Sequence, residues 1–133
     1  MYDKDIVKDI LIQIDVALDK ILIRSAKISD AAYLSDSEEG MEKLDGICML
    51  FIGVAESLKD IDKITNGELL PRYPKIDWIG VKGFWDIVVY RHFDIDAELV
   101  YWICTHELRP LSDTIKAMLR EFEPSLDSII VPL

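Results

Sequence analysis

Residues 37–63, SEEGMEKLDGICMLFIGVAESLKDIDK, carry a helical pattern with one apolar face. The apolar side chains recur at three- and four-residue spacing, while Glu, Asp and Lys fill the opposite face, which is typical of an amphipathic helix. The face consists of Met41, Leu44, Cys48, Phe51, Ala55 and Leu58, widened by Ile47 and Ile52. Ser35, followed three residues later by Glu38, predicts a capping box at the start, and Asn66-Gly67 predicts the stop. The segment therefore predicts a long helix that buries one face.

A second amphipathic pattern precedes it, between Asp3 and about Ile28. Its apolar residues are again three and four apart: Val7, Ile10, Leu11, Ile14, Leu18 and Ile21. Asp3 or Asp5 provides a side-chain oxygen that can cap the first turn. We expect this helix to pack antiparallel to the helix over 37–63.

A third helix is expected from Asp77, as its cap, to about residue 90. The connection over 66–75 contains two prolines, which exclude a helix interior there. The core face of the third helix would be formed by Val81, Phe84 and Val88. The β-branched run 87–90 also has strand propensity, but no segment of the chain alternates with period two, so we expect a helix.

The fourth pattern runs over 97–122, with Asp94 or Asp96 as its cap. Its expected core residues are Leu99, Trp102, Ile103, Leu111, Ile115, Met118 and Leu119. Pro110 lies inside the pattern and predicts a kink or break near Leu108. The patterns together predict an all-α fold, an antiparallel up-down bundle of four helices. We expect one domain over residues 1–133, with an apolar tail at about 124–133.

The chain is acidic, with 15 Lys and Arg against 25 Asp and Glu in 133 residues, a formal net charge of −10. Such a surface repels nucleic acid and anionic membranes unless a local basic patch overrides it, and it suits a basic protein partner. No apolar run approaches the roughly 20 residues needed to cross a bilayer, and the acidic start does not resemble a signal peptide. Cys48 and Cys104 lie among apolar residues, as buried reduced thiols do. These features together predict a cytoplasmic protein.

Neither a metal site nor a cofactor site is indicated by the motifs. His92, His106 and Cys104 lack metal-ligand spacing, and the chain has no glycine-rich phosphate loop. No pattern marks a serine or cysteine nucleophile. The four carboxylates Asp86, Asp94, Asp96 and Glu98 could form a catalytic cluster. We favour a capping role, because Asp94 and Asp96 flank a helix start, where negative charge is stabilising.

Residues 77–96, DWIGVKGFWDIVVYRHFDID, resemble the signature region of the HepT-like branch of HEPN domain proteins. The resemblance extends to AESLK at 55–59, NGELL at 66–70, Tyr73-Pro74 and AELV at 97–100. It implies a HEPN-like bundle of four to five helices that forms a homodimer, with the signature helices of two subunits meeting in a cleft. Members are typically toxins of toxin–antitoxin pairs and act as metal-independent endoribonucleases. A minimal nucleotidyltransferase neutralises them, in the best-described pairs by adenylylating a tyrosine of the signature.

The family's active pattern is an Arg, four residues, a His, one residue and a Tyr. Arg stabilises charge on the phosphate, and His moves protons near neutral pH. Aligned on Gly83 and on FDID at 93–96, this chain has different residue types at all three positions: Trp85, Tyr90 and His92. Asp86, which follows the Arg position, is retained, and Arg91 stands between Tyr90 and His92.

Three functions remain open from the sequence. The chain is a ribonuclease toxin that acts on RNA through His92 and Arg91, or a non-catalytic HEPN dimer that binds a small nucleotidyltransferase. In the third interpretation, the resemblance is structural only.

Overall fold

The computed structural model describes residues 2–90 and 94–122. The side chains of four of these residues are not described: Phe84, Val88, Val89 and Tyr90. The described part consists of six α-helices and one 3-10 turn, and it contains no strand. The elements are α1 (Lys4–Ser25), α2 (Ala31–Asp36), α3 (Glu38–Ile64), η1 (Leu70–Arg72), α4 (Trp78–Tyr90), α5 (Ala97–His106) and α6 (Leu108–Phe122). The predicted all-α class is confirmed, and residues 87–90 are helical rather than a strand.

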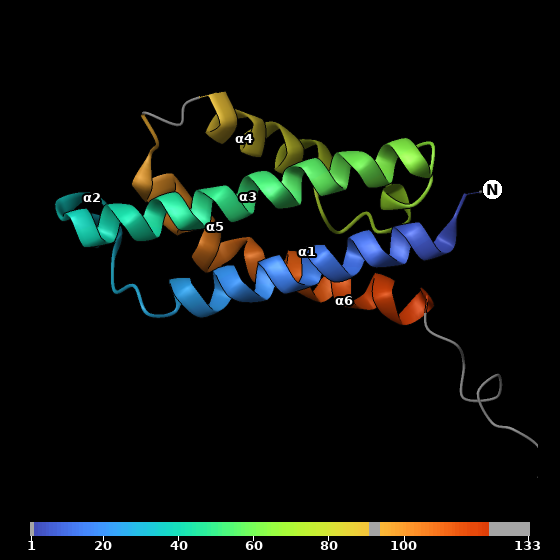
Figure 1. The fold of residues 1–133 in the computed structure, drawn as a ribbon, viewed down its shortest axis with the longest axis horizontal. Helices are drawn as coiled ribbons and strands as arrows, with labels where there is room; N and C mark the ends of the chain where they lie inside the picture. Colours follow the sequence, from blue (N-terminus) through green and yellow to red (C-terminus); the bar gives the residue numbers. More distant parts are fainter. Residues whose placement is uncertain (1, 91–93, 123–133) are drawn as a thin grey trace, which may run out of the picture.

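The two longest helices, α1 and α3, lie side by side and antiparallel at the centre of the bundle (Figure 1). α6 packs along another side of α1, and α4 packs along α3. The short helix α2 connects α1 with α3 and contacts both α3 and α5. Within the described residues, no helix combines the length and the apolar character that crossing a bilayer requires.

Three of the predicted helices start at aspartates that the sequence predicts as caps. Asp3 accepts the N–H groups of Asp5 and Ile6 at 3.0 and 3.3 Å. Asp77 accepts the N–H of Gly80 at 2.9 Å, and Asp96 accepts that of Leu99 at 3.1 Å. These bonds satisfy backbone donors that have no partner within a first helical turn.

The predicted capping box at Ser35 is wrong. Ser37 is the cap of α3 and accepts the N–H of Gly40 at 3.0 Å. Ser35 belongs to α2, where its hydroxyl donates to the carbonyl of Ala32. The unpredicted helix α2, itself capped by Asp30, takes up the residues that were expected to precede the cap.

The first helix ends earlier than predicted, at Ser25 rather than about Ile28, whereas the stop predicted at Asn66-Gly67 is confirmed. α3 ends at Ile64, and Asn66 and Gly67 follow with φ of 56° and 72°, the left-handed conformation that ends many helices. The fourth predicted helix is broken as expected, since α5 ends at His106 and α6 begins at Leu108, two residues before Pro110.

Most of the predicted core residues are buried, but Met41, Leu99 and Trp102 are exposed. Leu99 and Trp102 lie on the exposed side of α5, because the helix packs on the bundle through Val100, Ile103 and Cys104. Val81 is half-buried, and the core residues of α4 with described side chains are Trp78 and Trp85.

Both cysteines are buried, free thiols, as the sequence predicts. Burial disfavours the thiolate and raises the pKa of Cys48 to about 12 and that of Cys104 to about 11. Neither sulfur is therefore a nucleophile at neutral pH.

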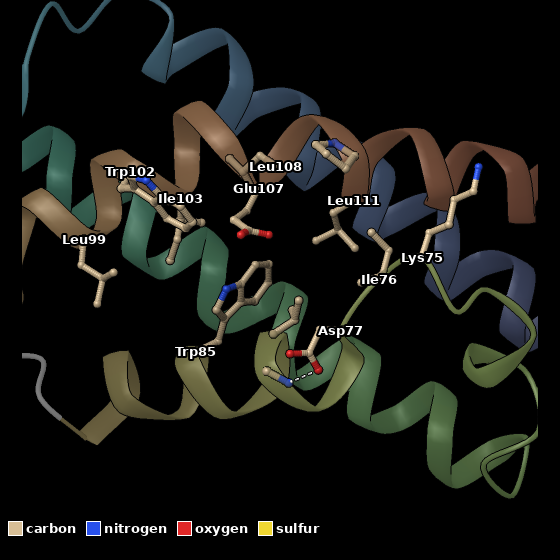
Figure 2. Close-up of a pocket in the computed structure, with 13 residues that line it drawn as sticks. Lys75, Ile76, Asp77, Trp85, Leu99, Trp102, Ile103, Glu107, Leu108 and Leu111 are labelled. Carbon is tan, nitrogen blue, oxygen red and sulfur yellow. Dashed lines mark hydrogen bonds between the residues drawn. The ribbon is translucent and has the colours of Figure 1, made fainter.

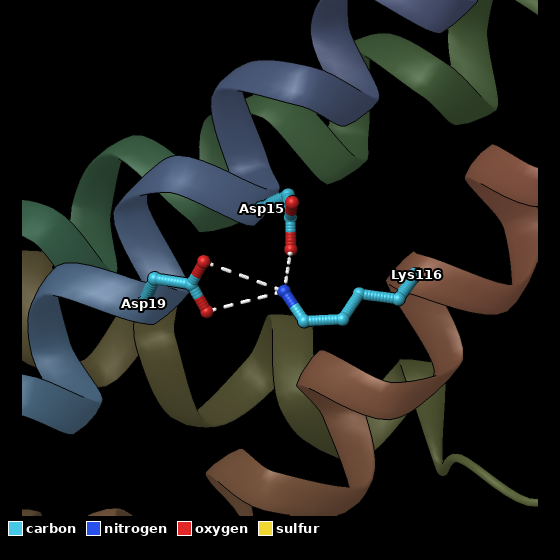
Figure 3. A network of polar contacts seen from close by, with 3 residues as sticks. All are labelled: Asp15, Asp19 and Lys116. Carbon is cyan, nitrogen blue, oxygen red and sulfur yellow. Dashed lines mark hydrogen bonds and ion pairs between the residues drawn. The ribbon is translucent and has the colours of Figure 1, made fainter.

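A polar network ties α1 to α6 across the bundle (Figure 3). The ammonium of Lys116 on α6 donates to Asp15 and, at 3.2 and 3.3 Å, to both carboxylate oxygens of Asp19 on α1. The hydrogen bond to Asp15 is the main cause that raises the pKa of Lys116, with Asp19 adding to it.

We expect Lys116→Met to lower the free energy of unfolding at pH 7 by about 1 kcal/mol, because the network is partly exposed to water. The pKa of Lys116 is raised in the folded state. The contribution is therefore complete below the unfolded pKa of about 10.4 and is lost as the pH rises through the folded pKa. Urea unfolding of the wild type and the variant at pH 7 and pH 11 measures this, with the exposed Lys20→Met as the control. A loss that is equal at both pH values would contradict the prediction.

Candidate functional site

The signature helix α4 is held at its first turn and along one side. The indole N–H of Trp78 donates to the carbonyl of Tyr73 at 3.0 Å, which fixes the start of the helix against the preceding loop. Along its length, Lys82 pairs with Asp62, and Asp86 pairs with Lys59, both partners being on α3. Two ion pairs, together with apolar side chains, therefore hold α4 against α3.

Trp85, at the family's Arg position, is a core residue. Only 2% of it is exposed, and its ring stacks on Phe51 of α3 with centroids 5.0 Å apart and an interplanar angle of 12°. Figure 2 shows the indole pointing from α4 toward Glu107, at the junction of α5 with α6. Because this indole is uncharged and buried, it cannot provide a cation to the phosphate of an RNA.

Asp86 is engaged with α3. Its carboxylate pairs with the ammonium of Lys59, which also lies 3.8 Å from Glu56. Of the other carboxylates in the possible catalytic cluster, Asp96 is the cap of α5, while Asp94 and Glu98 are exposed. The capping interpretation is confirmed for Asp96.

The other candidate residues are only partly placed. Tyr90 is the last residue of α4, with its side chain outside the described part, and Arg91 and His92 lie outside the described residues. The structure therefore places Trp85 and Asp86 on α4, and the roles of Tyr90, Arg91 and His92 stay predictions. The described residues contain no group of three or more His, Cys, Asp or Glu suited to hold a metal ion.

A cavity of about 460 Å³ lies beside Trp85, between α4 and the junction of α5 with α6 (Figure 2). Its wall is mostly apolar, and its polar side chains are Lys75, Asp77 and Glu107. Sequence reasoning missed Glu107. The only sequence signal near Glu107 was the predicted break near Leu108. A break between two helices can turn a side chain into a cavity that a continuous helix would not form.

A comparison with protein families identifies the chain. The family model described as Ribonuclease HepT-like matches residues 14–118, which is most of the chain and includes α4 and the cavity. No curated protein matches the chain significantly, and no solved structure does. The helical bundle and the match over 14–118 agree, and the chain belongs to the HepT-like family.

Proposed function

We propose that this chain is the HepT-like component of a toxin–antitoxin pair that works in the cytoplasm as a non-catalytic homodimer and binds a minimal nucleotidyltransferase. The family supports a role related to HEPN toxins or ribonucleases. The observation that carries the non-catalytic part is the burial of Trp85 against Phe51. Because that position holds a core indole, the charge that family members place there is missing.

The remaining motif positions support the same proposal on chemical grounds. Tyr90 replaces the family's His, and an unperturbed tyrosine has a pKa of about 10, so it is a poor base at neutral pH. His92 has the residue type that the family uses to move protons, but it stands two residues beyond the position of the family's His. The overall charge of −10 opposes binding of RNA and favours a basic protein.

The purified chain is therefore expected to leave tRNA and mRNA intact. Cleavage would be followed on gels for the wild type, His92→Ala and Arg91→Ala, at enzyme concentrations where a family ribonuclease would be detected. The same preparation is expected to co-purify with a nucleotidyltransferase encoded beside it, and its intact mass would report any added adenylate.

RNA cleavage by the wild type that disappears in His92→Ala would contradict the proposal. It would establish instead a ribonuclease with altered residues, which uses His92 and Arg91 on an RNA substrate. If no nucleotidyltransferase co-purified, the proposed partner would be contradicted, whereas the proposal that the chain does not cleave RNA would stand.

A further inference from the structure

The cavity beside Trp85 combines a buried apolar floor with an exposed apolar rim. Trp85, Leu108 and Leu111 form the floor and are almost fully buried. On the rim, Leu99 is 40% and Trp102 is 47% exposed. Large apolar side chains exposed around an apolar cavity are typical of a surface that another molecule covers.

Glu107 gives this cavity its chemical character. It is the residue between α5 and α6, and its carboxylate points toward the ring of Trp85 (Figure 2). Among the described residues, no side chain pairs with this carboxylate. Asp77 presents a second carboxylate from the opposite wall, where one oxygen accepts the N–H of Gly80. The ammonium of Lys75 points away from the centre of the cavity. Glu107 and Asp77 are both exposed residues, so the cavity offers negative charge at the edge of an apolar surface.

We propose that this cavity receives an arginine side chain of a partner protein, carried in an apolar segment of that partner. The guanidinium would pair with Glu107 through two parallel hydrogen bonds, and the methylene groups would lie on the floor formed by Leu108 and Leu111. Apolar neighbours of the arginine would cover Leu99 and Trp102. Guanidinium suits this place because it is planar, weakly hydrated and matched to a carboxylate.

Charge distinguishes this occupant from a second copy of the chain. A second copy that met this face through the same surface would bring a second set of the same two carboxylates, Glu107 and Asp77, toward the first. A basic partner would instead be attracted over a distance and held at the carboxylates. The inference rests on the proposed role as a binding protein and assigns a surface and a chemistry to it.

The test uses two short peptides and the indole N–H signals of the ¹⁵N-labelled full chain. One peptide is acetyl-Leu-Leu-Arg-Leu-Leu-amide, and in the other citrulline, a neutral isostere, replaces the arginine. We expect the indole signals of Trp85 and Trp102 to shift on titration. The signal of Trp78 should stay in place, because its N–H is bonded to Tyr73 and the residue does not line the cavity.

The arginine peptide is expected to bind about threefold more tightly than the citrulline peptide, since a charge-assisted hydrogen bond to an exposed carboxylate is replaced by a neutral one. Glu107→Gln should remove this preference. Glu42→Gln, which makes the same charge change at an exposed position of α3 outside the cavity, should keep it.

Equal affinities for the two peptides, unmoved Trp85 and Trp102 signals, or loss of the preference in Glu42→Gln would overturn the inference. A dimer that Leu99→Asp converts to a monomer in light scattering would overturn it too, because a second copy would then occupy the cavity. A nucleotidyltransferase that co-purifies equally with the wild type and Glu107→Gln, together with silent peptides, would overturn this inference and leave the proposed function standing.

Discussion

Trp85→Ala is expected to lower the free energy of unfolding by about 3–5 kcal/mol, the range measured when a large buried aromatic side chain is truncated. The indole is 2% exposed and stacks on Phe51, so its removal leaves an empty space between α3 and α4 and breaks a ring contact. Urea unfolding followed by far-ultraviolet circular dichroism measures the loss. Trp85→Arg should be at least as damaging, because it adds an unpaired charge to the same space.

Trp102→Ala is the matched control, since it makes the same chemical change on α5 at a residue that is 47% exposed. It stacks on His106 at the surface, with ring centroids 4.9 Å apart, and its loss should cost about 1 kcal/mol. Equal losses for the two tryptophans would contradict the assignment of Trp85 to the core. Position 85 could then line a cleft, as the Arg position of the family does, and ribonuclease activity would have to be considered again.

Features that depend on neighbouring residues could be predicted from the sequence. The caps at Asp3, Asp77 and Asp96 and the stop at Asn66-Gly67 each depend on side chains within a few residues of the helix end. The break near Leu108 followed from one proline. The helical class followed because most apolar stripes have the period of a helix.

Features that depend on how helices meet could not be predicted in the same way. Leu99 and Trp102 have core spacing, but α5 packs on the bundle through Val100, Ile103 and Cys104 and leaves them exposed. α2 is too short to show a period. Ser35 rather than Ser37 matched the capping box because Glu38 stands three residues after Ser35, whereas Gly40 stands three residues after Ser37. At the site, the resemblance to the family motif identified position 85 as a functional position. That its indole is buried became visible only in the packing of α4 on Phe51.

Gly40→Ala is expected to lower the free energy of unfolding by about 3 kcal/mol. A Cβ atom at Gly40 would lie 1.8 Å from the carbonyl oxygen of Tyr33 and 2.8 Å from its carbonyl carbon. These are backbone atoms of α2, so no side chain can rotate away, and α2 must shift or unravel. Inserting a methyl group into a well-packed place costs about 1–3 kcal/mol, and an immovable neighbour puts this substitution at the upper end.

Gly53→Ala makes the same change on the same helix with the opposite expected sign. Apart from its chain neighbours and the backbone of its own helix, no atom of the described residues lies within 4 Å of a Cβ at Gly53, which is exposed in the middle of α3. Alanine there should raise the free energy of unfolding by about 0.5–1 kcal/mol, because glycine loses more backbone entropy in a helix. Urea unfolding of the two variants measures both effects, and circular dichroism of Gly40→Ala reports any helix lost with α2. A neutral Gly40→Ala would mean that α2 does not pack against the first turn of α3 as described.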